Sequence, residues 1–246
     1  MRPLLIDGFC GEGGAAVGYY RAGWDILGWD NSPARLKRYP FPSVEGDALA
    51  FLSTLATRRE VFYDGRWRHV AAAHMSPPCT GYTRGTAAIP DRLERYDRLI
   101  AATRELLEQT GLPYVIENVE DARPELRDPI TLCWTEFRDP GSVRDADGTP
   151  LWMRRHRLFE SNVPLWPGGG CQHPADMQCA GAYGGARRDK DEARNIRKGG
   201  YVPHVDVMRE LLGTPWMSEK GCQLSIPPVY TEHIGAQLLD HVRAAA

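Results

Sequence analysis

A cysteine placed between an apolar run and a turn is the first residue in this chain with the chemistry of a catalyst. Cys79 follows two prolines, directly after the apolar run 70–75. The prolines fix the backbone, so we expect the thiol at a defined point at a sheet edge. An inert buried thiol is the usual role of a cysteine, and it is the one we assign to Cys133 and Cys222. The position of Cys79 instead predicts a nucleophile, which must form a thiolate before it attacks.

Further charged residues border apolar runs. Glu117 ends the run in YVIENV, and partial desolvation there would raise its pKa and suit it to donate a proton near neutral pH. A capping or turn-forming Glu-Asn pair is the alternative. Arg155 and Arg157 in MRRHR point to one face if this segment is a strand. Two positive charges on one face would need an anionic partner, although a basic edge exposed to solvent is the simpler interpretation.

The segment DGFCGEGG, residues 7–14, lies between an apolar run and a helical stretch. Its glycines permit a tight turn and let a ligand approach the backbone, while the following helix N-terminus offers unpaired N–H groups. Asp30 closes the next strand, where a ribose-binding acid belongs in a nucleotide-binding fold. Together these features favour a nucleotide-like cofactor over an ordinary glycine turn.

These residues require elements that bring them together. The first half of the chain alternates short apolar runs with helical stretches, which is typical of an α/β fold whose parallel sheet binds ligands at the carboxyl ends of its strands. We expect strands at 4–9, 26–30, 70–75 and 114–118. We expect helices at 14–22, 33–38, 91–110, 205–212 and 231–242.

Composition narrows the class of protein. The chain has 246 residues, of which 42% are hydrophobic and 25% charged, as in a soluble globular protein. This length suits one large α/β domain with or without a small module. A net charge of -2 excludes a global positive field, so a polyanion would need a local patch. Six cysteines are too sparse for a disulfide framework, and the sequence carries neither a secretory signal nor a membrane span, so we expect a cytoplasmic protein.

Periodicity fails after residue 165, where glycine, proline, cysteine and charged residues dominate. A basic cluster lies there, with a solvated loop as the alternative to a phosphate-binding patch: Arg187, Arg188, Lys190, Arg194, Arg197 and Lys198. Cys171, His173 and Cys179 make a zinc site conceivable, with His204 as a further ligand. Their spacing is not that of a standard zinc finger, so we assign no metal.

Taken in order, the motifs DGFCGEGG, SPPC, ENV, the RxR of MRRHR and IPPVYTEHIG resemble those of the DNA cytosine carbon-5 methyltransferases. The resemblance covers nearly the whole chain. It implies a Rossmann-like sheet of seven mostly parallel strands flanked by helices, with a small target-recognition insert. The implied division is a catalytic and cofactor-binding core at 1–164, the insert at 165–204, and a segment at 205–246 that returns to the core.

The resemblance also implies a cofactor, S-adenosylmethionine, with S-adenosylhomocysteine as product. Asp30 would hold the ribose hydroxyls and Asp47 would lie near the adenine. The implied cofactor-binding residues are Asp7, Phe9, Gly11, Gly13, Gly14, Asp30, Asn31, Asp47, Ala48, Pro77, Ser225 and Ile226. The implied DNA-binding residues are Arg187, Arg188, Arg194, Arg197 and Lys198.

The implied reaction starts when Cys79 adds to carbon 6 of cytosine, because carbon 5 is itself a poor nucleophile. Glu117 would hydrogen-bond ring nitrogen 3, and Arg155 would meet the carbonyl oxygen of the base. Arg157 is the second candidate for that contact, and otherwise supports Glu117 or a phosphate. The family turns the target nucleotide out of the duplex to reach it.

The chain departs from the family pattern at Thr80, Met153 and Leu224, none of which is the nucleophile or the acid. Its short insert suggests a short or relaxed target sequence, as in compact viral or orphan methyltransferases. We therefore expect a monomer that acts on DNA in a bacterial or phage-infected cytoplasm. The same chemistry on RNA or a free cytidine nucleotide is one alternative, and a non-catalytic binding protein is another.

Overall fold

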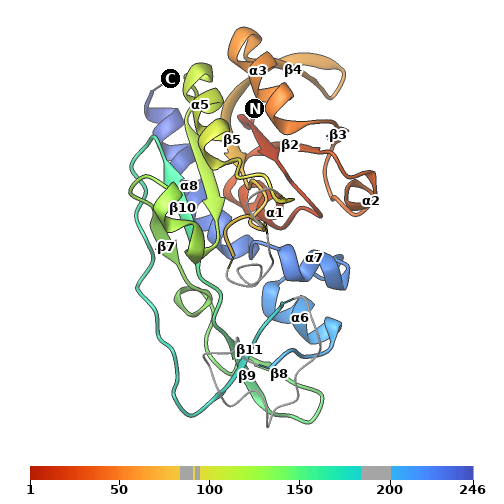
Figure 1. Ribbon diagram of the computed structural model, residues 1–246, viewed down its shortest axis with the longest axis vertical. Helices are drawn as coiled ribbons and strands as arrows, with labels where there is room; N and C mark the ends of the chain where they lie inside the picture. The colour runs from red at the N-terminus through yellow and green to blue at the C-terminus, as the bar shows by residue number, and fades with distance from the viewer. Residues whose placement is uncertain (84–90, 92–94, 184–200, 246) are drawn as a thin grey trace.

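The computed structural model describes residues 1–83, 91, 95–183 and 201–245. Its main body is a mostly parallel sheet (Figure 1). Along the sheet, the order is β3 (Ser43–Glu45), β2 (Asp25–Asp30), β1 (Leu4–Gly8), β5 (Arg66–Met75), β6 (Tyr114–Asn118), β10 (Arg157–Ser161) and β7 (Ile130–Leu132). The first five strands in this order, from β3 through β2, β1 and β5 to β6, run parallel to one another. Strand β10 is antiparallel to both of its neighbours, and β4 (Glu60–Tyr63) pairs antiparallel with β5. The predicted α/β fold is therefore confirmed.

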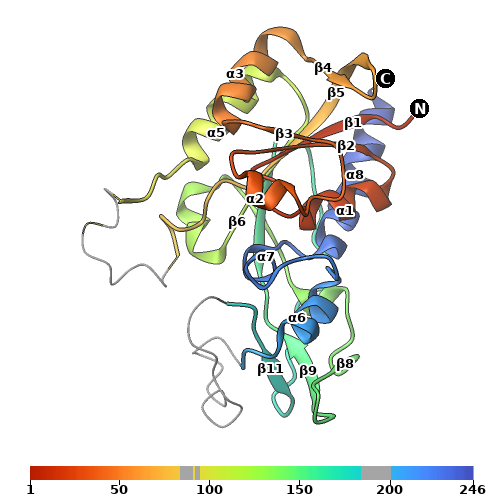
Figure 2. The same cartoon turned by 90° about the vertical axis from the view of Figure 1, so that its right-hand side faces the viewer.

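Helices cover both faces of this sheet because successive strand residues point in opposite directions. On one face, Ile6 packs in a core with α3 (Ala48–Arg58) and α5 (Ile100–Thr110). On the other face, Leu5 packs with α1 (Gly14–Ala22) and α8 (Pro228–Ala244). Figure 2 shows the two helix pairs on opposite sides of the strands. The C-terminal helix α8 and the N-terminal strand β1 therefore contribute side chains to the same core.

A second, smaller sheet lies at the other end of the molecule (Figure 1). It consists of β8 (Val143–Arg144), β9 (Pro150–Met153) and β11 (Gln178–Ala180). Its core also takes side chains from α6 (Val205–Leu212) and α7 (Glu219–Leu224). Residues before and after the 165–204 segment therefore share a core with β11. The remaining short elements are α2 (Pro33–Leu36), η2 (Glu120–Glu125) and η3 (Trp134–Glu136).

Most predicted elements are found within a few residues of their expected ends, and α1, α6 and β6 match to the residue. The single helix expected over 91–110 is wrong, because residues 97–99 are not helical and α5 begins only at Ile100. The hydroxyl of Tyr82 accepts the N–H of Ile100, at 3.2 Å, and so caps the helix from another part of the chain. Residues 92–94 lie outside the described part of the chain. No helix among the described residues is long and apolar enough to cross a membrane.

Helices α1 and α8 approach closely at Gly18. A Cβ atom there would lie 2.1 Å from the carbonyl oxygen of Pro228 and from the hydroxyl of Thr231. Neither atom belongs to a flexible side-chain end, so the helices would have to separate. We expect Gly18→Ala to lower the free energy of unfolding by on the order of 3 kcal/mol, measured by urea denaturation.

Gly169→Ala is the matched control, because a Cβ at Gly169 would meet nothing within 4 Å. Equal stability of the two variants would contradict the close α1–α8 approach.

Candidate active site

The residues with catalytic chemistry gather at one edge of the main sheet. Strands β1, β5 and β6 are parallel neighbours, so the loops that follow them leave from the same edge. Cys79 follows β5 and Glu117 lies near the end of β6. Because β10 runs antiparallel to β6, its first residue, Arg157, lies at this edge as well.

A direct hydrogen bond joins the two motifs that carry Cys79 and Glu117. The side-chain amide of Asn118 donates to the carbonyl of Pro77 at 2.9 Å, and both residues are buried. The carbonyl of Cys79 accepts the N–H groups of Tyr82 and Thr83, so the chain turns immediately after the thiol. These bonds hold Cys79, which is half-buried, at a defined place beside β6.

Glu117 is buried and paired. Its carboxylate lies 3.0 Å from Nε of Arg157, and both side chains are nearly covered. Burial raises the pKa of Glu117, opposed by the charges of Arg157 and Arg155 and by a hydrogen bond from Ser76. The rise brings the protonated form of Glu117 closer to neutral pH than it is for an ordinary glutamate.

The same arginine acts on the nucleophile. Burial raises the pKa of the Cys79 thiol, while the charge of Arg157 opposes the rise and that of Glu117 adds to it. In the ligand-free protein the thiol is therefore protonated near neutral pH. Arg157 is the group whose charge most favours the thiolate.

Arg155 has a different environment from Arg157. Its guanidinium is buried and donates to backbone carbonyls of Ala182, Cys222, Gln223 and Ser225, with distances of 2.5 Å to 3.4 Å. Alternation would have pointed both arginines to one face only if both lay in a strand, and that condition is not met, because β10 begins only at Arg157. Alternation does not apply to the irregular residues before it. Arg155 thus holds the C-terminal segment and the end of β11 against the core.

The glycine-rich loop after β1 has the form of a ligand cradle. Phe9 adopts a positive φ of 56°, a conformation that a non-glycine residue rarely takes. A Cβ atom at Gly11 would meet nothing within 4 Å, so space lies open above that backbone. The Asp30 carboxylate accepts the N–H of Gly11 at 3.0 Å and that of Ser32 at 2.8 Å. Asp30 therefore ties this loop to the end of β2.

Asp7, beneath the loop, is a buried acid with an unused oxygen. The hydroxyl of Tyr39 donates to one carboxylate oxygen at 3.0 Å, whereas the other has no hydrogen-bond partner in the described structure. Burial raises the pKa of Asp7 to about 7, the Tyr39 hydrogen bond opposes the rise, and the charge of Asp30 adds to it.

The other residues assigned to the cofactor lie around this loop or near it. Gly13 is the N-cap of α1, and a Cβ at Gly14 would lie 2.5 Å from the Ile226 carbonyl oxygen. Ser225, next to Ile226, is buried and holds Arg155 through its carbonyl.

Asp47 instead caps α3, because its carboxylate accepts the N–H of Ala50 at 2.8 Å. Ala48 is the buried first residue of that helix, and Asn31 is exposed beside Asp30.

Behind Glu117 lies a chain of hydrogen bonds that no motif of the sequence predicts. The Tyr19 hydroxyl lies 3.0 Å from Nδ1 of His74, whose Nε2 lies 2.8 Å from the Ser76 hydroxyl. Ser76 in turn bonds Glu117. Burial lowers the pKa of His74 to about 3, so this imidazole stays neutral. Ser76 adjoins the prolines before Cys79, but nothing in the sequence relates His74 to Tyr19.

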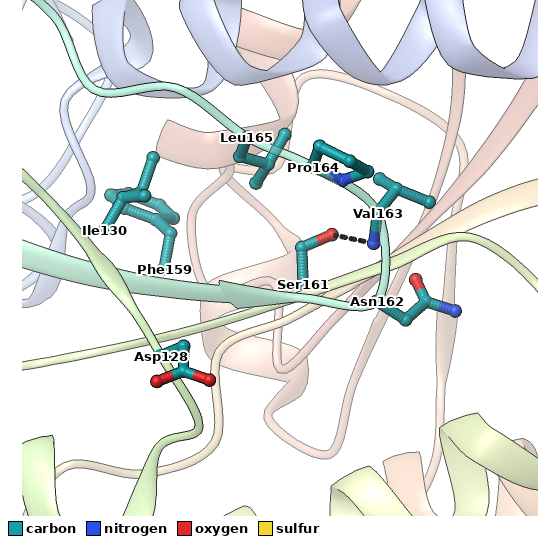
Figure 3. Close-up of a pocket in the computed structure, with 8 residues that line it drawn as sticks. All are labelled: Asp128, Ile130, Phe159, Ser161, Asn162, Val163, Pro164 and Leu165. Atoms are coloured by element: carbon teal, nitrogen blue, oxygen red, sulfur yellow. Dashed lines mark hydrogen bonds between the residues drawn. The ribbon is translucent and has the colours of Figure 1, made fainter.

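Two pockets of the described structure lie outside the Cys79–Glu117 region. One, of about 360 Å³, is lined by β10 and the chain after it, including Ser161 and Asn162 (Figure 3). The other, of about 480 Å³, lies beside α3 and is lined by Trp29 and Phe51 and by Asp47, one of the residues assigned to the cofactor. Neither is lined by Cys79 or Glu117. The basic residues assigned to DNA, Arg187, Arg188, Arg194, Arg197 and Lys198, lie outside the described residues.

Solved structures share this architecture. A candidate DNA modification methyltransferase encoded within an E. coli prophage matches with a TM-score of 0.58 and 14% identity, covering 98% of this chain and 99% of that one. The S. pombe Dnmt2 methyltransferase matches with a TM-score of 0.54 and 14% identity over the same shares. The Entamoeba histolytica methyltransferase EhMeth matches with a TM-score of 0.53 and 11% identity, again over 98% and 99%.

No model of a protein family and no curated protein matches the chain. The structural likeness extends over nearly the full length of each chain, and at this level of identity it shows the fold. The fold is that of methyltransferases with a Rossmann-like sheet. The expectation drawn from the resemblance to the cytosine carbon-5 methyltransferases is therefore confirmed at the level of the fold.

The buried Asp7 makes stability depend on pH. Its pKa is about 7 in the folded protein against an ordinary 3.8, so the folded state holds the proton more tightly. The protonated form of Asp7 therefore favours the folded state, and this stabilisation is fully present below pH 4 and is lost as the pH rises through 7. Asp7→Asn keeps the Tyr39 acceptor without the charge. We expect the variant to gain up to ~3 kcal/mol relative to wild type between pH 5 and pH 8, measured by urea denaturation. A difference that does not change with pH would contradict the buried charge.

Arg155 is expected to be structural. Arg155→Met leaves several buried carbonyls without a donor, and we expect it to lower the free energy of unfolding by more than ~3 kcal/mol. Arg154→Met is the matched control, because Arg154 is exposed and its loss should change stability by less than ~0.5 kcal/mol. Urea denaturation compares the two, and equal stabilities would refute the structural role.

Proposed function

We propose that the protein is an S-adenosylmethionine-dependent DNA methyltransferase that modifies carbon 5 of cytosine. The observation that carries the proposal is the arrangement of Cys79, Glu117 and Arg157 at one sheet edge, with the nucleophile within electrostatic reach of the buried ion pair. A binding protein has no need for a half-buried thiol held beside a protonatable carboxyl group. The fold shared with methyltransferases supports the same conclusion.

The residues around the glycine-rich loop suit the cofactor. S-Adenosylmethionine supplies an electrophilic methyl group and carries a positive charge on sulfur. The open space over Gly11 fits a ligand that needs close backbone approach, and the carboxylate of Asp30 lies beside it. Phe9, Gly11 and Asp30 would hold it, with Ile226 closing the start of α1.

The chain's own residues would then act on the base. The Cys79 thiol first loses its proton to water, and the thiolate then forms a bond to carbon 6. Glu117 donates a hydrogen bond or proton to ring nitrogen 3, which stabilises the electron density that the addition moves into the ring and onto carbon 5. Carbon 5 would take the methyl group and then give up its own proton to a base such as water, and the carbon–sulfur bond breaks as the ring double bond is restored and the thiolate leaves. We assign the carbonyl oxygen of the base to Arg157, because the donors of Arg155 already bind backbone carbonyls.

DNA is the favoured substrate because the E. coli neighbour is described as a DNA modification methyltransferase encoded within a prophage. The target base would have to leave the helical stack to reach Cys79, at a cost of a few kcal/mol. RNA or a free cytidine nucleotide would suit the same residues, and the experiment below separates the three. We expect a monomer in the cytoplasm.

A methyl-transfer assay tests the proposal. We expect wild type to transfer radiolabelled methyl groups to cytosine-containing duplex DNA in preference to RNA or dCMP. Cys79→Ala should lower the rate by more than roughly 1000-fold. Cys179→Ala is the matched control, because Cys179 is buried in β11 and lies outside the site.

Covalent capture gives a second readout. DNA containing 5-fluorocytosine cannot lose fluorine from carbon 5, so we expect wild type, and not Cys79→Ala, to remain attached to it under denaturing conditions. Equal methyl incorporation by wild type and Cys79→Ala would refute the mechanism. Methyl transfer to RNA or dCMP but not to DNA would show that DNA is not the substrate.

A further inference from the structure

Four potential metal ligands that have no part in the proposed reaction converge beside the start of β10. One ligand atom from each of Cys133, His156, Cys171 and His173 lies within 4.8 Å of all the others. Sγ of Cys133 is 3.2 Å from Nε2 of His173, and Sγ of Cys171 is 3.2 Å from Nε2 of His156. A tetrahedron of zinc ligands has edges of roughly 3.3–3.8 Å, given Zn–S near ~2.3 Å and Zn–N near ~2.0 Å. The four atoms are thus already close to the corners of a coordination shell.

The surroundings orient these ligands. Glu120 accepts from Nδ1 of His156 at 2.8 Å, which leaves Nε2 directed at the cluster. Carboxylate groups hold metal-binding histidines in this way in many proteins. The ring of His173 packs against that of His156, with centroids 5.2 Å apart, and against Trp152, with centroids 5.0 Å apart. Both histidines are therefore held by contacts that do not use the inward nitrogen.

The four residues come from separate parts of the chain. Cys133 follows β7, and His156 lies between β9 and β10. Cys171 and His173 belong to the connection from Ser161 to Gln178, which contains no helix or strand. That connection runs a long way along the molecule in Figure 1. Val163 and Leu165 at its start and Met177 at its end pack against the two cores, whereas the residues between them are rich in glycine and proline.

We propose that Cys133, His156, Cys171 and His173 bind one zinc ion as a structural site. Two thiolates and two neutral imidazoles balance the charge of Zn²⁺, and a tetrahedral set of two sulfurs and two nitrogens is typical of zinc. The protein fills every coordination position, so the ion stabilises structure and activates no water. It joins the long connection to the sheet at the segment that also carries Arg157.

This site differs from the zinc site that the sequence made conceivable. Cys171 and His173 belong to it, but Cys179 lies on β11 with its sulfur directed to the carbonyl of Ala180. His204 instead caps α6. Cys133, which we expected to be an inert thiol, is one of the four.

Metal analysis tests the proposal. We expect untagged wild type, purified under reducing conditions with zinc in the medium, to hold one zinc per chain. Cys171→Ser and His173→Asn should each lose most of it, and because both residues are exposed these changes should leave the far-UV circular dichroism unchanged. Cys179→Ser is the matched cysteine control and should keep the zinc. Cobalt substitution should give thiolate-to-metal charge-transfer bands in wild type and weaker bands in Cys171→Ser.

Several results would overturn the proposal. Wild type that holds no zinc after dialysis against excess zinc and reductant would do so. Equal loss of zinc from Cys179→Ser and Cys171→Ser would also do so. None of these measurements uses methyl transfer, so the result is independent of the proposed function.

Discussion

The buried carboxylate of Glu117 is the constraint on which the arrangement of this site depends. A charge with so little exposed surface is costly unless a cation meets it, and Arg157 supplies that cation at 3.0 Å. Arg157 can do so only because β10 runs antiparallel to β6, which places the start of one strand beside the end of the other. The antiparallel direction of β10 therefore brings the charge of Arg157 to the buried carboxylate of Glu117. The same guanidinium sets the electrostatic environment of Cys79.

Arg155 and Arg157 show how neighbours in sequence acquire different roles. Arg157 is the first residue of β10 and lies near the end of β6, with its side chain beside Glu117. Arg155 belongs to irregular backbone, and its guanidinium binds carbonyls of residues far along the chain, among them Ser225. The charge of Arg157 meets the carboxylate of Glu117, whereas Arg155 provides the hydrogen-bond donors that buried carbonyls need.

The glycine-rich loop is likewise held by residues distant in sequence. Glu12 accepts hydrogen bonds from the backbone N–H and the hydroxyl of Ser218, at 2.7 Å and 2.6 Å, which joins the loop to the start of α7. Thr231 in α8 donates to the carbonyl of Ala15 in α1 at 2.8 Å. The first and last parts of the chain therefore form one unit, and the loop is shaped by segments that the chain adds at its end.

The sequence by itself determined the elements whose signals are local. Apolar runs bounded by glycine, proline or charge located β1, β5 and β6, and β6 is found at the predicted residues. The order of the motifs predicted that Cys79 and Glu117 act together, and both lie at the same edge of the sheet. Local pattern could not place the start of α5, because the cap comes from the hydroxyl of Tyr82.

Only the tertiary structure decided which polar groups meet. The separate roles of Arg155 and Arg157 depend on backbone geometry, which residue type does not specify. Cys133, His156 and His173 lie in three separate connections between strands, and they converge only because the fold brings these connections together. Such contacts join residues far apart in the chain, and their energies depend on distance and burial. Both quantities exist only once the chain has folded.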